Sequence, residues 1–146
     1  MRPHSIIMFE RLFLASLVLG ALGVLLSYQE AVGLVANDPG MQQFGLGSGV
    51  ISGFVIGVVT VSYAIYLLLW HLIARRASNV AKWILVVLMV LGLLSALPGL
   101  TGTWNSTFVL SLVVYALEIL AIVYLFRPDA VAWFDGKGQA DPATFD

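Results

Sequence analysis

The stretch VISGFVIGVVTVSYAIYLLLWHLIARR, residues 50–76, decides the fold of this chain. Residues 50–73 contain no Asp, Glu, Lys or Arg, and the run then ends in Arg75 and Arg76. A helix needs about 20 apolar residues to cross the roughly 30 Å of hydrocarbon in a bilayer. The stretch therefore predicts a membrane-spanning helix with a basic end.

Three further runs resemble it in length and apolar character, at residues 6–27, 80–100 and 107–126. Hydrophobic residues make up 60% of the chain and charged residues only 10%, too few charges to cover a water-soluble surface. We therefore expect an all-α fold, an integral membrane bundle of four transmembrane helices. The bundle accounts for a single domain over residues 1–134, with the lipid bilayer as its surroundings.

The basic residues all lie on one side of these runs, at Arg2, Arg11, Arg75, Arg76, Lys82, Arg127 and Lys137. The connections after the first and third runs carry none of them. By the positive-inside rule, both termini and the middle loop are expected in the cytoplasm, for a multi-pass protein of a bacterial inner membrane. No small-x-small cleavage site follows the first run promptly, so we predict an uncleaved helix rather than a signal peptide.

Composition also argues against several classes of function. A net charge of −1 gives no basic field for nucleic acid, and the absence of cysteine removes disulfides and thiolate metal sites. It also excludes the quinone-coupled disulfide-forming enzymes of the membrane. Neither a nucleophile beside a base nor a cluster of metal ligands is apparent, and His71 is interpreted as an interfacial histidine. We predict a non-enzymatic protein that needs no cofactor or metal.

Beyond the fourth run, Pro128 favours a break and a new first turn. We expect a short interfacial segment over residues 128–134, followed by an acidic cytoplasmic tail at residues 135–146. Indole rings prefer the headgroup layer, where the N–H stays hydrated. The predicted interfacial anchors are therefore Trp70, Trp83, Trp104, Trp133 and Phe134.

Two terminal motifs carry a resemblance. The start Arg2-Pro3-His4-Ser5-Ile6-Ile7 and the ending Tyr124-Leu125-Phe126-Arg127-Pro128-Asp129-Ala130-Val131-Ala132-Trp133-Phe134 resemble a group of small bacterial inner-membrane proteins. These share an Arg-Pro start, four helices and a Phe-Arg-Pro-acid-Ala…Trp-Phe ending. The resemblance implies the same four-helix topology, and it implies no catalytic residues.

Glu118 is the most informative polar residue inside a predicted span. A carboxylate there costs about 2.5–3.5 kcal/mol on insertion scales, so it is expected to face protein or water and find a partner. Glu118 lies nine residues before Arg127, and Arg11 lies nine residues after Arg2, so the two are predicted at similar depth. We expect Glu118 to pair with Arg11 or another basic group at that depth, fixing helix register. The alternatives are a protonatable site on a transport path and a contact to lipid or a partner subunit.

Small residues at spacings of three and four mark one face of the 50–73 helix, at Gly49, Gly53, Gly57, Thr60 and Ala64. Such a face allows another helix to approach closely, so it is predicted to be a helix-packing surface. Its neighbour is either a helix of the same chain, which we favour, or another subunit. The first helix offers a matching surface at Ser16, Gly20, Gly23 and Ser27.

These features favour an accessory, assembly or scaffold subunit of a bacterial inner-membrane complex, in contact with other subunits or with copies of itself. The alternative is a small oligomeric transporter or channel that uses Glu118 as a proton or cation site. A third possibility is the binding of a lipid or quinone in a groove between helices.

Overall fold

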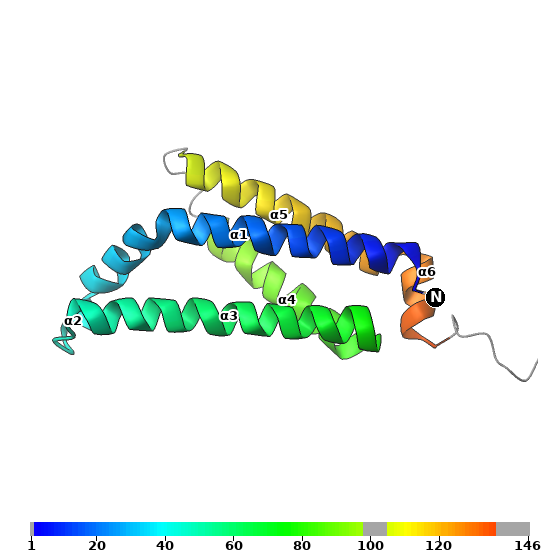
Figure 1. Ribbon diagram of the computed structural model, residues 1–146, viewed down its shortest axis with the longest axis horizontal. Coiled ribbons are helices and arrows are strands. Elements are labelled where there is room, and N and C mark those ends of the chain that lie inside the picture. Colours follow the sequence, from blue (N-terminus) through cyan, green and yellow to red (C-terminus); the bar gives the residue numbers. More distant parts are fainter. Residues whose placement is uncertain (1, 98–104, 137–146) are drawn as a thin grey trace, which may run out of the picture.

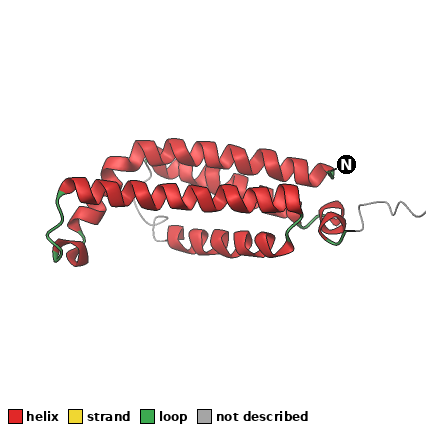
Figure 2. Ribbon diagram, turned by 60° about the horizontal axis from the view of Figure 1, so that its bottom comes forward, coloured by secondary structure: helices red, strands yellow, loops and turns green. Residues whose placement is uncertain are grey.

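The computed structural model describes residues 2–97 and 105–136, and these contain helices and connecting loops without a strand (Figure 2). Four helices are long and apolar enough to cross a membrane: α1 (His4–Asn37), α3 (Ser48–Arg76), α4 (Asn79–Ala96) and α5 (Ser106–Leu125). Two short helices, α2 (Pro39–Gln42) and α6 (Pro128–Phe134), complete the fold. The predicted all-helical architecture with four apolar helices is confirmed.

The first helix is much longer than the sequence predicts. It has 34 residues, about 50 Å at 1.5 Å per residue, because residues 28–37 continue it beyond the expected end at residue 27. Figure 1 shows this last part of α1 turning toward α2. The third predicted helix, at residues 80–100, corresponds to α4, which ends at Ala96; the rest of that run and Trp104 lie outside the described residues.

Polar side chains define several helix starts. The carboxylate of Asp38, the hydroxyl of Ser78 and the amide oxygen of Asn105 accept hydrogen bonds from N–H groups in the first turns of α2, α4 and α5. At the end of α3, Ala77 adopts the left-handed conformation with φ of 47°, and its N–H donates to the carbonyl of Leu72. This cap reverses the chain directly into α4, so α3 and α4 form a helical hairpin.

Packing is concentrated at one end of the bundle. α1 lies along α5 and also contacts α3, whereas α4 packs on α3 and touches α5 little (Figure 1). The main buried cluster joins the start of α1 to the last part of α3, the start of α4, the end of α5 and α6; its members are Ile6, Phe9, Phe13, Leu69, Ile73, Ala74, Ala81, Leu85, Ala121, Leu125 and Ala130. We call this the closed end.

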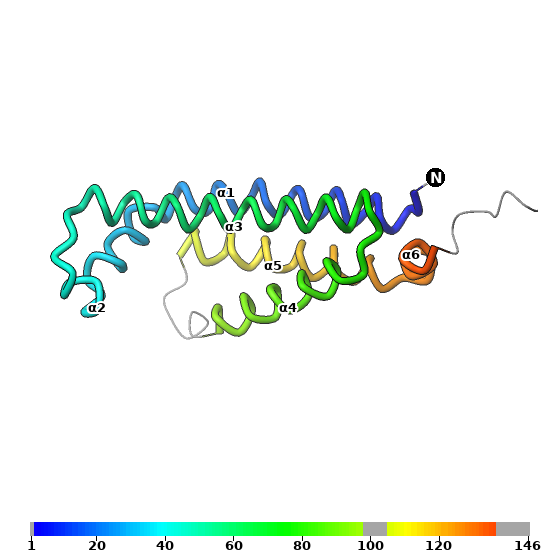
Figure 3. Tube along the Cα trace, turned by 90° about the horizontal axis from the view of Figure 1, so that it is seen from below, coloured from blue at the N-terminus to red at the C-terminus, as the bar shows by residue number. Residues whose placement is uncertain are grey.

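The short helix α6 lies across the closed end, in a direction that crosses that of the long helices (Figures 1 and 3). Its Ala130 is buried, and the ring of Phe134 lies 4.7 Å from Nζ of Lys82 on α4. Lys82 is only 6% exposed, and its ammonium also lies 5.0 Å from the ring centre of Phe126. Cation–π contacts therefore help to hold α6 against α4 and the end of α5.

The predicted aromatic anchors differ in their surroundings. Trp83 is 54% exposed, as expected of a ring facing headgroups. Trp70, Trp133 and Phe134 instead pack partly against the buried cluster of the closed end. The indole N–H groups of Trp70 and Trp133 are buried and have no acceptor in the described part of the chain, so the expected hydrated N–H is wrong for these two rings.

The small-residue face of α3 does not pack against the other described parts of the chain. Gly49, Gly53, Gly57, Thr60 and Ala64 are all exposed. A Cβ atom added at any of the three glycines would meet nothing within 4 Å. The favoured prediction of a neighbour within the same chain is therefore wrong, because α3 turns its bulkier side chains Ile51, Val55, Leu69 and Ile73 inward instead.

Candidate functional site

Glu118 lies where the four long helices line a partly open cavity of about 300 Å³. The cavity lies further along α1 than the closed end and is lined by Ser16 and Gly20 of α1, Tyr63 and Tyr66 of α3, and Gly92 of α4, with Ser111, Tyr115 and Glu118 contributed by α5. On α5, the last three residues are spaced by four and three, so they share one face of the helix. This size is at the lower end of the range for small-ligand sites.

The carboxyl group of Glu118 has no ion pair and no hydrogen bond within the described ranges 2–97 and 105–136. The predicted partner, Arg11, is exposed and does not reach it. The buried face of α1 carries Phe9, Phe13 and Ser16, and Arg11 is about 200° around the helix from Phe9. The predicted Arg11–Glu118 pair is therefore wrong, because Arg11 points away from the bundle.

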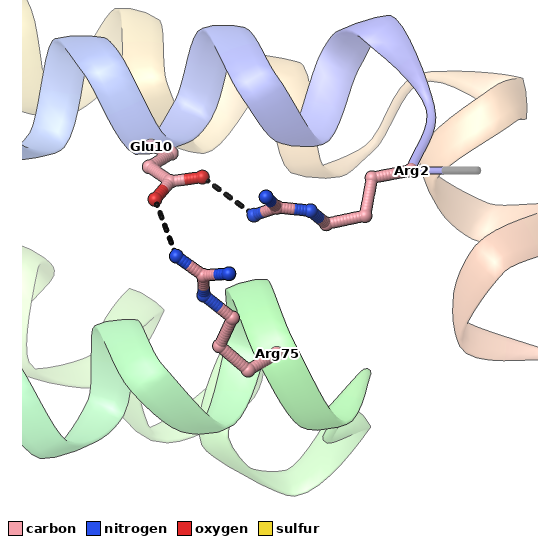
Figure 4. A network of polar contacts seen from close by, with 3 residues as sticks. All are labelled: Arg2, Glu10 and Arg75. Carbon is pink, nitrogen blue, oxygen red and sulfur yellow. Dashed lines mark hydrogen bonds and ion pairs between the residues drawn. The ribbon is translucent and has the colours of Figure 1, made fainter.

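Glu10, the neighbour of Arg11, forms the ion pairs of this region (Figure 4). Its Oε2 lies 2.8 Å from Nη1 of Arg2, and its Oε1 lies 3.5 Å from Nη2 of Arg75. The first contact joins Arg2, which precedes α1, to the second turn of that helix, and the second contact joins α1 to the end of α3. Glu10 and Arg11 are adjacent in the sequence, but only Glu10 faces the bundle, and Arg11 is exposed.

Hydroxyl groups around the cavity donate their hydrogens to backbone carbonyls. Tyr63 donates to the carbonyl of Leu17 at 3.3 Å, and Tyr115 donates to that of Gly92 at 3.5 Å. Three serines donate to carbonyls of their own helices, namely Ser16, Ser27 and Ser111. These oxygens keep only lone pairs for an occupant. Together with the carboxyl oxygens of Glu118, they give the cavity several acceptors. The hydroxyl of Tyr66 also lines the cavity, has no hydrogen bond within the described residues and can still donate.

Three tyrosines surround the acid. Tyr63, Tyr66 and Tyr115 line the same cavity as Glu118. Gly20 makes room for one of them, because a Cβ there would lie 3.0 Å from the hydroxyl oxygen of Tyr63. A carboxylate beside several aromatic rings is the combination that holds organic ammonium groups.

The small residues of α1 that the sequence matched to the α3 face have a different role. Ser16, Gly20, Gly23 and Ser27 line the cavity, and the space left by Gly23 is closed by Leu110 of α5 at 3.5 Å. Spacings of four, three and four predict that they share a face, but not what the face encloses. Tyr63 and Tyr66 were missed as site residues; their spacing of three on α3 is a signal that could have indicated them.

Within the described residues, no three His, Cys, Asp or Glu side chains gather as a metal-binding group. No protein-family model, curated protein or solved structure matches this chain. The resemblance to small bacterial inner-membrane proteins stays a prediction from the two terminal motifs, and function is inferred from the cavity itself.

Proposed function

We propose that this chain is a small, non-enzymatic membrane protein that takes up a proton or a monovalent cation at Glu118. This is the transporter or channel alternative that the sequence left open. The observation that carries it is the unpaired carboxyl group of Glu118 in a cavity lined by acceptor oxygens. A purely structural acid inside a span is expected to have a partner, since an unpaired charge there is costly.

Acceptor oxygens favour a positively charged or proton-donating occupant. An anion would face the lone pairs of Tyr63, Tyr115 and Ser111 as well as the carboxylate. A cation gains charge-assisted contacts with the carboxylate and contacts with the tyrosine ring faces. A proton competes with the cation for the same oxygens, which is the basis for coupling the two in an exchange.

Binding of tetramethylammonium to the purified protein in lipid nanodiscs tests this function. We expect saturable binding at pH 8 that weakens as the pH is lowered, because protons compete for Glu118. Glu118→Gln should abolish it, whereas Glu30→Gln, an exposed acid on α1, should leave it unchanged. Binding that persists in Glu118→Gln would reject the proposal. The proposed cation site would also be rejected if the wild-type protein, shown to be folded, did not bind tetramethylammonium.

A second candidate is the accessory, assembly or scaffold role, and the uncovered small-residue face of α3 favours it. A face that carries Gly53 and Gly57 suits close helix packing with another subunit or a second copy. Gentle extraction, a native gel and mass spectrometry of the band would test this role. A stoichiometric complex lost in Gly53→Leu and Gly57→Leu supports it, and an unaltered single-chain band contradicts it.

Membrane location and orientation are part of the proposal. The described basic residues lie at or near the closed end, which supports a bacterial inner-membrane protein with that end, and both termini, in the cytoplasm. Cysteine substitutions at exposed Arg76 and at Gln43 beside α2 would test it in a chain that has no cysteine of its own. An impermeant thiol reagent added outside should label Gln43→Cys and not Arg76→Cys; the reverse would invert the topology.

A further inference from the structure

A second hollow adjoins the Glu118 cavity and differs from it in chemistry. It is a groove of about 630 Å³ between α4 and α5, lined mainly by apolar side chains such as Leu93, Leu97, Phe108 and Leu112. Ser111 and Tyr115 line both the groove and the cavity, so the two spaces meet at these residues. α4 and α5 touch little along their length, which leaves the groove between them.

The few polar groups of the groove are satisfied within the protein. The hydroxyl of Ser95 donates to the carbonyl of Leu91 at 2.8 Å, and that of Ser111 donates to Thr107 at 2.9 Å. A hydrocarbon chain in the groove would therefore leave no side-chain donor of these serines unpaired. The groove fits an apolar chain, whereas the adjoining cavity fits a cation.

Tyr115 stands where the two spaces meet. Its hydroxyl bridges α5 to the carbonyl of Gly92 on α4, at a distance of 3.5 Å that is at the outer limit for a hydrogen bond. With the bridge in place, Ser111 and Tyr115 still line both spaces, so the two are in contact beside it. A molecule with a chain on one side of Tyr115 and a head group on the other can then occupy both spaces together.

From this juxtaposition we propose that the occupant is a single-chain amphiphilic cation, with an alkylammonium head group at Glu118 and a hydrocarbon chain in the α4–α5 groove. The proposal rests on the cation site proposed above and names its ligand class. A phospholipid is the poorer occupant, because its phosphate would face the carboxylate and the acceptor oxygens of the cavity. A neutral lipid would fill the groove and leave Glu118 without a partner.

The test compares dodecyltrimethylammonium, tetramethylammonium and dodecanol by titration into nanodiscs that contain the full chain, with empty nanodiscs subtracted. The chain holds the head group near Glu118 and raises its effective concentration, so the long-chain cation should bind about tenfold more tightly than tetramethylammonium, or better. Dodecanol should show no binding that depends on Glu118.

Ala116→Phe separates the chain site from the head-group site, because Ala116 lines the groove and is not among the residues that line the cavity. It should remove the advantage of the long chain and leave tetramethylammonium binding unchanged. Val87→Phe is the matched control, since Val87 is exposed and lines a different groove, on α4, and the change should alter the binding of neither cation.

The two levels of the proposal fail in different ways. If both cations bind with equal affinity through Glu118, or if Ala116→Phe leaves the long-chain advantage intact, the amphiphile is overturned and the cation site stands. If neither cation binds in a manner that depends on Glu118 in a folded protein, the cation site is overturned and the amphiphile with it.

Discussion

Asp129 of α6 caps the start of α1 by binding Ser5 across a sequence separation of 124 residues. Its Oδ2 accepts the backbone N–H of Ser5 at 3.1 Å, and its Oδ1 accepts the Ser5 hydroxyl at 2.7 Å. Pro3 precedes α1 and gives it no side-chain cap, so the cap comes from the other end of the chain. A negative charge at a helix N-terminus also interacts favourably with the helix dipole. Both terminal sequence motifs therefore meet in one contact.

This contact predicts a pH-dependent contribution to stability. The hydrogen bond from the Ser5 hydroxyl, with those from backbone N–H groups, lowers the pKa of Asp129 below its usual value of 3.8. The folded state therefore favours the carboxylate. Its contribution is fully present above the usual pKa and is lost as the pH falls through the lowered pKa of the folded state.

Asp129→Ala should lower the free energy of unfolding by about 1 kcal/mol at neutral pH, the usual cost of losing a helix cap. Thermal unfolding in detergent, compared with that of Glu30→Ala, measures this. The difference between Asp129→Ala and the wild type should narrow as the pH falls from 5 toward 3. A difference that stays constant over this range would show that the carboxylate charge does not contribute.

Glu10→Gln should weaken the closed end by roughly 0.5–1 kcal/mol, because it removes the contacts with Arg2 and Arg75 at partly exposed positions. Arg11→Gln is the matched control, since Arg11 is exposed on the same helix and has no ion pair within the described residues. Thermal unfolding at low and high salt would show a salt-sensitive loss for Glu10→Gln alone. An equal loss in Arg11→Gln would instead restore a structural role for Arg11.

Two glycines of α1 should respond differently to alanine. Gly33→Ala meets nothing within 4 Å and should stabilise the helix by about 0.5–1 kcal/mol. Gly20→Ala should raise the free energy of unfolding by less, because its new methyl group would lie 3.0 Å from the hydroxyl oxygen of Tyr63. The methyl group would displace this hydroxyl from the carbonyl of Leu17. Thermal unfolding of the two variants measures the difference, and equal gains would contradict the close approach of Tyr63 to α1.

The α3–α4 turn contains a strained residue. Ala77 has a φ of 47°, a left-handed conformation that costs a residue with a side chain roughly 1–2 kcal/mol relative to its preferred ones. Ala77→Gly should therefore raise the free energy of unfolding by up to about 1 kcal/mol. Ala15→Gly, inside α1, should lower it by a similar amount. A loss of stability in Ala77→Gly would contradict the left-handed cap.

The helices could be predicted from the sequence because each apolar run carries its own signal. Charges at Arg75 and Arg76 and the break at Pro128 mark ends that the structure places at Arg76 and Leu125. The end of α1 was placed too early, at residue 27, because Gln29 and Glu30 interrupt the apolar run there. Residues 31–36 are apolar again, and the helix continues through them to Asn37. Pro39 disfavours the helical conformation for Asp38, whose ψ is 126°, so α1 ends at Asn37.

Side-chain partners were predicted less well, because depth along a helix does not determine which face is buried. Arg11 and Glu118 were matched by depth alone, yet Arg11 lies on the outer face of α1 and Glu118 lines the cavity beside Ser16. The small-residue face of α3 was mispredicted for the same reason. Its spacing defines a surface, but only the packing of Ile51, Val55 and Leu69 determines that this surface faces away from the bundle.

Infrared difference spectroscopy of the protein in nanodiscs tests the central claim most directly, because it observes the Glu118 carboxyl group itself. Lowering the pH should produce the C=O band of a protonated carboxylic acid that is absent in Glu118→Gln, and adding tetramethylammonium should remove that band by displacing the proton. A Glu118 band that is unaffected by the cation would contradict the proposal that protons and cations compete for this cavity.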